Sequence, residues 1–89
     1  MHEQSKIYQN IKDGKLDTAL KDLFENIEEN PAIVENYINA GIVLSDVGEI
    51  EKAERFFQKA LTIEPENGAV YYNLANIYYN EERYNEAIK

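Results

Sequence analysis

Histidine, serine and adjacent glutamates are the residues of this sequence whose chemistry could support catalysis. The single histidine, His2, lies beside the amino terminus, where chains commonly fray, so it is not expected to activate Ser5 or Ser45. The carboxylates of Glu28–Glu29 and of Glu81–Glu82 are sequence neighbours that project to different azimuths, so neither pair can flank one substrate. We therefore expect no enzyme active site, no metal site and no cofactor.

The composition narrows the class of protein further. The absence of cysteine excludes disulfides, thiol catalysis and thiolate metal sites. The 17 acidic and 9 basic residues give a formal charge of -8, which repels nucleic-acid phosphates and anionic lipid headgroups. No apolar run approaches the roughly 20 residues of a membrane-spanning helix, and the first residues carry no secretory signal. These features predict one small soluble, cytoplasmic domain without a nucleic-acid or membrane partner.

The basic residues are scattered along the chain, with one exception. Lys52, Arg55 and Lys59 form one stripe of a predicted helix, with Glu51 and Glu54 among them. Opposite charges at such spacings commonly form solvated pairs, so we expect this stripe to be an ordinary exposed face.

The segment YYNLANIYYN, residues 71–80, carries four tyrosines as two pairs spaced by seven residues. At about 100° per residue of a helix, Tyr71 and Tyr78 share one stripe. Tyr72 and Tyr79 share a second stripe, about 100° away from the first. A helix that packs on a single core needs one apolar face, so the second aromatic face requires another helix or a ligand.

The whole sequence repeats with a period of 34 residues. The matching residues are Pro31 and Pro65, Gly14 and Gly48, and Ala19, Ala53 and Ala87. Each unit contains two helical patterns and no sustained period-2 alternation, which argues against strands.

The middle unit defines the expected helix bounds. Its first helix is expected to begin at Asn30 or Pro31 and to end at Gly48. Its second helix is expected to run over residues 50–63, before Pro65 breaks the chain. Asn67 can then cap the helix of the next unit.

The residues at this period resemble the tetratricopeptide repeat, whose signature combines aromatic, leucine-glycine, tyrosine, alanine, phenylalanine, alanine and proline positions at fixed separations. In the second unit the matching residues are Tyr37, Ala40, Gly41, Leu44, Ala53, Phe57, Ala60 and Pro65. The third unit has Tyr71, Leu74, Ala75, Tyr78, Tyr84 and Ala87, and the first has Leu16, Ala19, Leu23, Ile27 and Pro31. The resemblance implies an all-α fold of antiparallel helix-turn-helix hairpins stacked as a right-handed α-solenoid.

The resemblance divides the chain into a first repeat at 1–33, a second at 34–67 and a third at 68–89 that ends within its second helix. The opening segment is the least typical part and is expected to form a polar-backed capping helix. The third unit has Glu82 where the other units have glycine, so we expect its turn to form differently, with Asn80 in the left-handed conformation.

The register also predicts the core. Small residues such as Gly41 allow the two helices of a unit to approach closely, while Phe57 fills the space beside them. By the same register, Tyr71 and Tyr78 are expected to lie in the core, each with its hydroxyl at a polar edge.

Tetratricopeptide repeats commonly hold a partner against a concave wall formed by the first helix of each unit. In this register the wall consists of Gln4, Tyr8, Ile11, Ile38, Asn39, Ile42, Tyr72, Asn73, Asn76 and Tyr79. Tyrosine rings provide contact area at low entropic cost, and amides can pair with a peptide backbone. The resemblance therefore implies a module that binds an extended peptide or partner segment. The alternative is an assembly module that packs against copies of itself or further repeats.

The best-known groove of this kind, the carboxylate clamp, holds an acidic C-terminal tail through lysine, asparagine and arginine side chains. Gln4, Tyr8, Ala69 and Asn73 occupy positions where the clamp needs those residues, and only Asn39 agrees with it. Because the net charge is -8 as well, a carboxylate ligand would gain little here.

The third unit is shorter than the period predicts, because the segment matching Phe57, Ala60 and Leu61 is missing. Its absence is expected to expose an apolar face made of Tyr71, Leu74, Ala75, Tyr78, Tyr84, Ala87 and Ile88. We therefore expect a fragment of a longer repeat protein, and a homodimer in which two copies bury these C-terminal faces against each other.

Overall fold

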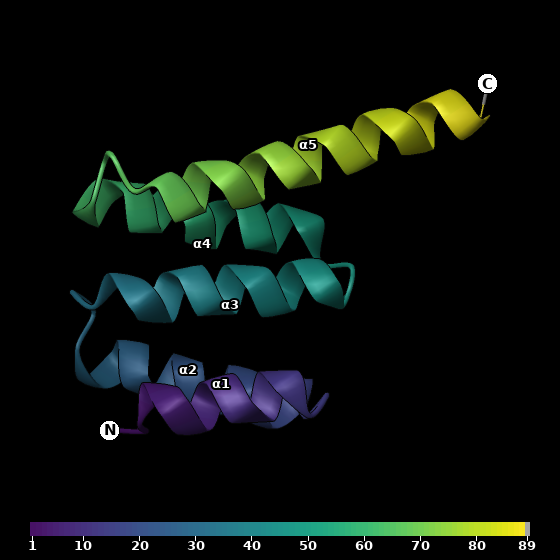
Figure 1. Cartoon of the computed structure of the whole chain (residues 1–89). Helices are drawn as coiled ribbons and strands as arrows, with labels where there is room; N and C mark the ends of the chain where they lie inside the picture. The colour runs from purple at the N-terminus through teal and green to yellow at the C-terminus, as the bar shows by residue number, and fades with distance from the viewer. Residues whose placement is uncertain (89) are drawn as a thin grey trace.

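The computed structural model is all-helical over the residues that it describes, which are 1–88 for the backbone and 1–82 for the side chains. The helices are α1 (Gln4–Lys12), α2 (Leu16–Glu29), α3 (Val34–Asp46), α4 (Ile50–Ile63) and α5 (Gly68–Ile88). Figure 1 shows them stacked side by side, with α1, α3 and α5 in the front layer and α2 and α4 behind. The predicted fold class, helical hairpins stacked as an α-solenoid, is thereby confirmed.

Two glycines close the first two hairpin turns in the same way. Gly14 and Gly48 have φ of 77° and 88°, in the left-handed region that residues with a Cβ avoid. The residue after each glycine donates its N–H to a carbonyl of the preceding helix, at 2.8 Å in both turns. These bonds satisfy carbonyls that have no hydrogen-bond partner within the helix. The left-handed turn that forms them explains why glycine recurs at this position of the repeat.

Asparagine side chains form hydrogen bonds just before α3 and at the start of α5. α4 has the expected bounds, whereas α3 begins at Val34 rather than at Asn30 or Pro31. Asn30 Oδ1 accepts the N–H of Ala32 at 3.1 Å, and this local turn delays the helix. Asn67 caps α5 as expected, by accepting the N–H of that helix's third residue at 3.2 Å.

The expected turn of the third unit does not form. α5 continues as one helix from Gly68 to Ile88, and Asn80 is helical rather than left-handed. The earlier turns depend on glycine, whereas a left-handed Glu82 would bring its Cβ too close to a carbonyl oxygen. Without that glycine, the helical conformation extends through the expected turn.

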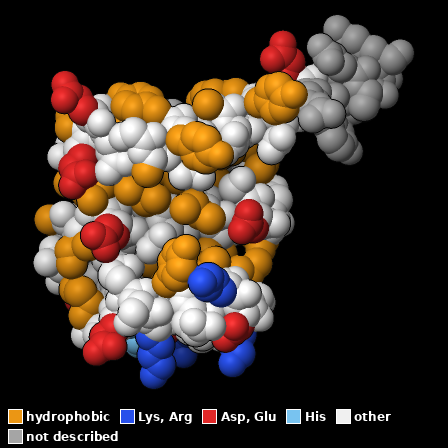
Figure 2. All heavy atoms as spheres, viewed as in Figure 1, with side chains coloured by type: hydrophobic (Ala, Val, Ile, Leu, Met, Phe, Trp, Pro, Cys, Tyr) orange, Lys and Arg blue, Asp and Glu red, His pale blue; other side chains and the backbone are white. Residues whose placement is uncertain are grey.

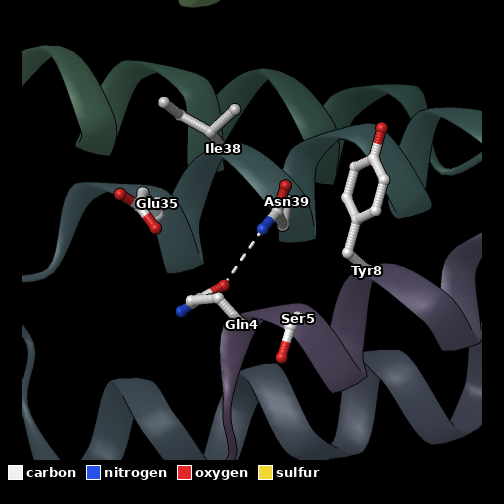
Figure 3. Close-up of a pocket in the computed structure, with 6 residues that line it drawn as sticks. All are labelled: Gln4, Ser5, Tyr8, Glu35, Ile38 and Asn39. Atoms are coloured by element: carbon white, nitrogen blue, oxygen red, sulfur yellow. Dashed lines mark hydrogen bonds between the residues drawn. The ribbon is translucent and has the colours of Figure 1, made fainter.

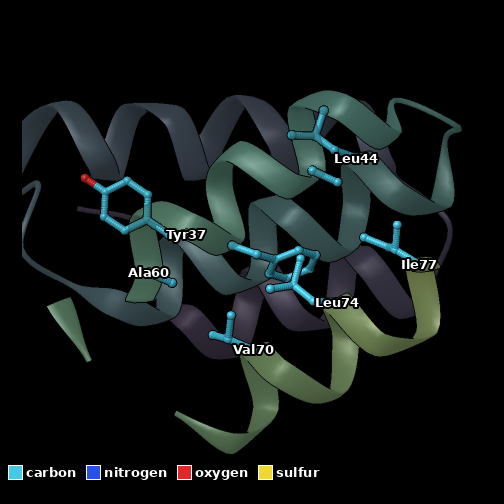
Figure 4. Packing of buried hydrophobic residues seen from close by; sticks show 8 residues of the cluster. Tyr37, Leu44, Ala60, Val70, Leu74 and Ile77 are labelled. Carbon is cyan, nitrogen blue, oxygen red and sulfur yellow. The ribbon is translucent and has the colours of Figure 1, made fainter. Parts of the chain in front are cut away.

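The core between α3 and α4 depends on a close approach at Gly41. A Cβ added to Gly41 would lie only 2.6 Å from the ring of Phe57, which is fully buried. The predicted role of this small residue is therefore confirmed. Figure 4 shows the packing of this cluster, whose buried members are Tyr37, Leu44, Ala53, Phe57, Ala60, Val70, Leu74 and Ile77. A second cluster joins the first three helices through Ile7, Ala19, Leu23 and Ala40.

The buried face of α5 differs from the expected one. The repeat register predicted Tyr71 and Tyr78 in the core, whereas the missing segment of the third unit predicted them to be exposed; they are 51% and 50% exposed, which agrees with the second expectation. Val70 and Ile77 are buried instead, and Leu74, which was expected to be exposed, is only 8% accessible. These three side chains face α3 and α4, while no helix of the described chain covers the tyrosine side of α5.

The hydroxyl of Tyr71 nevertheless reaches a polar edge, as expected. It donates to the carbonyl of Pro65 at 2.7 Å, and Tyr37 donates to the carbonyl of Pro31 at the same distance. The repeat is therefore visible in hydrogen bonds as well as in sequence. The predictions for Tyr84, Ala87 and Ile88 lie outside the side chains that the structure describes.

Candidate peptide-binding groove

A pocket of about 360 Å³ lies between α1 and α3, on the front layer of the stack. Helical spacing places its lining residues on facing sides of the two helices, because residues three or four apart share a face. Figure 3 shows the side chains around this pocket, which are Gln4, Ser5, Tyr8, Glu35, Ile38 and Asn39. Four of the predicted wall residues therefore meet at one pocket.

Amide side chains connect the two helices at the floor of this pocket. Asn39 donates to Gln4 Oε1 at 3.2 Å, and Gln4 Nε2 donates to the side chain of Asn36. Asn36 is fully buried and also accepts from Asn26 of α2 at 3.4 Å. These bonds fix Gln4 and Asn39, so the pocket has a positioned polar floor rather than two free amides.

A second pocket, of about 230 Å³, lies between α3 and α5. Its lining residues are Ile42, Ser45, Asp46, Phe57, Asn73, Asn76, Ile77 and Asn80. Three predicted wall residues, Ile42, Asn73 and Asn76, therefore line it. Asn73 Nδ2 donates to the carbonyl of Ala69 at 2.8 Å. This bond fixes the orientation of the Asn73 side-chain amide, including its oxygen.

Three predicted wall residues line neither pocket. Ile11 is half-buried and packs against the cluster formed by the first three helices. Tyr72 and Tyr79 are exposed on α5. Tyr8, by contrast, lines the first pocket, and the ammonium of Lys12 lies 5.5 Å from its ring centroid.

Both pockets contain a carboxylate that the sequence argument did not select. Glu35 lines the first and Asp46 the second, and no lysine or arginine lines either one. Helical spacing alone could have identified them, because Glu35 is one turn before Asn39 and Asp46 one turn after Ile42. Figure 2 shows acidic side chains over this face, with most of the visible lysine and arginine at its lower edge and one basic side chain on the face itself. The groove is therefore locally acidic.

The amino-terminal residues are attached to α2, and the expectation that His2 frays is wrong. The side chain of buried Asn26 donates to the carbonyl of His2 at 2.9 Å and accepts its N–H at 2.7 Å. The His2 ring nitrogen then lies 2.6 Å from Glu25 Oε2 and 3.4 Å from Asp22 Oδ1. The hydrogen bond with His2 lowers the pKa of Glu25 below its ordinary value.

His2, Asp22 and Glu25 also have the ligand types that divalent cations take, with their ligand atoms within 4.8 Å of one another. The sequence did not indicate this group, because His2 was expected to lie at a frayed end. The direct contact of 2.6 Å between His2 and Glu25 is that of a hydrogen-bonded pair. A cation would have to displace that bond.

The tetratricopeptide repeat family profile matches residues 44–89, slightly more than half of the chain. The chain therefore belongs to the tetratricopeptide repeat family, whose members generally mediate protein–protein interactions and are typically not catalytic. No curated protein matches this sequence. Among the described helices, none is long and apolar enough to span a membrane.

Proposed function

We propose that this protein is an interaction module that binds an extended peptide or partner segment in the groove of α1, α3 and α5, without catalysis. The observation that carries the proposal is the pair of pockets on successive front-layer helices. Each pocket combines apolar side chains, amides and one carboxylate, which is a suitable environment for a peptide side chain and its adjacent backbone. A bound peptide that crosses both pockets would contact most of the predicted wall residues.

The ligand's chemistry follows from the charges of the groove. Glu35 and Asp46 provide one carboxylate in each pocket, and the cation beside the groove is Lys12, whose ammonium lies over the Tyr8 ring without lining the first pocket. A peptide with lysine or arginine beside an apolar residue would complement both features, whereas an acidic tail would be repelled. Nucleic acid is disfavoured by the same carboxylates and by the net charge of -8.

The test is a peptide-array screen followed by fluorescence anisotropy with the tightest basic peptide. Tyr8→Ser should weaken binding by about tenfold, because the ring forms one side of the first pocket. Tyr71→Ser is the matched control, since the two tyrosines are 56% and 51% exposed and Tyr71 lines neither pocket. Equal affinities of Tyr8→Ser and the wild type, or a preference for acidic peptides, would contradict the proposal.

The second candidate function is assembly with other copies through α5. The observation that favours it is the exposed face of Tyr71, Ala75 and Tyr78, which no described helix covers. Burial of such a face stabilises association by about 25 cal/mol per Å² of apolar surface. Sedimentation over a wide concentration range should then show dimers that Tyr78→Ser weakens and Tyr72→Ser does not. A chain that stays monomeric at every concentration would exclude this function.

A further inference from the structure

A third pocket lies on the other layer of the stack, at α4, and we call it the back pocket. It has a volume of about 190 Å³ and is lined by Tyr37, Arg55, Phe56 and Lys59. The Tyr37 ring is buried, Phe56 is half-buried, and both basic residues are exposed. The back pocket is therefore an aromatic floor with two cations at its rim and no carboxylate in its lining.

The aromatic floor continues onto α2. The rings of Phe56 and Phe24 stack with centroids 5.6 Å apart, and the rings of Phe56 and Tyr37 lie 6.3 Å apart. Phe24 remains 40% exposed. Three aromatic rings from α2, α3 and α4 thus form one continuous row, which extends the apolar surface beyond the pocket.

The cations at the rim are not neutralised by their neighbours. The sequence predicted an ordinary exposed face for Lys52, Arg55 and Lys59, and all three side chains are exposed, although neither Arg55 nor Lys59 forms an ion pair with a described residue. Among the described residues, every ion pair joins Met1 or His2 to a carboxylate of α2. In a chain with a charge of -8, two adjacent unpaired cations are a local reversal of sign.

We infer that the back pocket binds an acidic segment of a partner protein that carries an aromatic side chain. The back pocket is open to solvent, so the ring of such a side chain would lie across the aromatic floor rather than inside a closed cavity. Arg55 and Lys59 then donate charge-assisted hydrogen bonds to carboxylates on either side of that ring. Among acidic polymers, a peptide is favoured over RNA because the rest of the protein repels a long polyanion.

This surface differs from the proposed groove in position and in charge. The groove faces the front layer and contains Glu35 and Asp46, whereas the back pocket contains Arg55 and Lys59. Opposite charges select opposite ligands. The protein therefore has two independent docking surfaces, one for a basic peptide and one for an acidic segment, and can bring two partners together.

The test uses a labelled short peptide in which one phenylalanine is flanked by aspartates and glutamates, with anisotropy measured at low salt. Arg55→Glu and Lys59→Glu should each weaken binding by about tenfold, because each replaces an attraction with a repulsion. Lys52→Glu is the matched control, since it makes the same charge change on the same helix but lies outside the pocket lining. Circular dichroism of all three variants verifies that the helices are retained.

Three results would overturn the inference. The first is equal weakening by Lys52→Glu, which would indicate a general charge effect rather than a pocket. The second is binding of single-stranded RNA that Arg55→Glu abolishes and that exceeds binding of the acidic peptide. The third is a peptide that does not saturate the wild-type protein. Tyr8→Ser should leave acidic-peptide binding unchanged, so failure of the groove and failure of the back pocket give different results.

Discussion

The replacement Gly41→Ala tests the central packing contact directly. The added Cβ would lie 2.6, 2.7 and 2.9 Å from three ring atoms of Phe57, whereas ordinary contacts are 3.4–4 Å. Phe57 is fully buried among core side chains, and the second pocket, which it also lines, is the space toward which its ring could shift. Overpacking of this kind costs about 1–3 kcal/mol, and the better helix propensity of alanine returns about 1 kcal/mol. With three contacts this short, we expect a net loss of about 1–2 kcal/mol.

Urea denaturation followed by circular dichroism measures this loss, and a double-mutant cycle identifies its cause. Phe57→Val removes the three ring atoms that the new Cβ would meet. In that background Gly41→Ala should stabilise the protein by up to about 1 kcal/mol, because only the helix-propensity gain remains. An osmolyte such as trimethylamine N-oxide can be added to all four proteins if Phe57→Val is only marginally folded.

Gly68→Ala is the control for glycine replacement in general. A Cβ at Gly68 meets no atom within 4 Å, and this residue begins α5. We expect it to stabilise the protein by about 0.4–1 kcal/mol, through reduced freedom of the unfolded chain. The reasoning is refuted if Gly41→Ala stabilises the wild-type protein, or if its effect is the same with and without the Phe57 ring.

Three further changes test other parts of the structure. Ile77→Ala should lower the free energy of unfolding by about 2–5 kcal/mol in urea denaturation, whereas Tyr78→Ser, at a half-exposed residue, should cost about 1 kcal/mol. Gly48→Ala should cost about 1–2 kcal/mol because its φ of 88° strains alanine, and a thermal melt would detect this. The hydrogen bond with His2 lowers the pKa of Glu25, so this contact stabilises the fold above the ordinary carboxyl pKa and is lost as the pH falls through the lowered one. His2→Ala, which removes the donor, should therefore raise the Glu25 pKa in an NMR titration, and an unchanged value would contradict the assigned cause.

The sequence predicted the elements whose causes are local. The bounds of α4 and the two glycine turns follow from capping and left-handed backbone, and these are confirmed. The close approach of Gly41 and Phe57 follows from the repeat register and is also confirmed. Each of these features depends on residues within one hairpin, so the sequence of a single repeat unit is enough to predict it.

The misassigned residues depend on what surrounds them. The register alone placed Tyr71 and Tyr78 in the core, whereas the missing segment of the third unit predicted that their side of α5 is uncovered, and their exposure agrees with that prediction. His2 was assigned by its position in the chain, although buried Asn26 provides both hydrogen-bond partners for its backbone. The groove remains a proposal, and its carboxylates Glu35 and Asp46 were missed because only apolar and amide positions were sought.

Phe56 lies where the two hydrophobic clusters meet, and this position affects how the stack unfolds. Each helix packs chiefly against helices near it in sequence, so the contacts are local and folding should be fast. Phe56 packs against both hydrophobic clusters and so couples them at the centre of the stack, between the outer helices α1 and α5. Each pocket of the groove uses one of these outer helices, α1 or α5, with α3 as the shared wall. A peptide that occupies both pockets would therefore contact both outer helices at once and slow their local unfolding, and its dissociation would be coupled to that local unfolding.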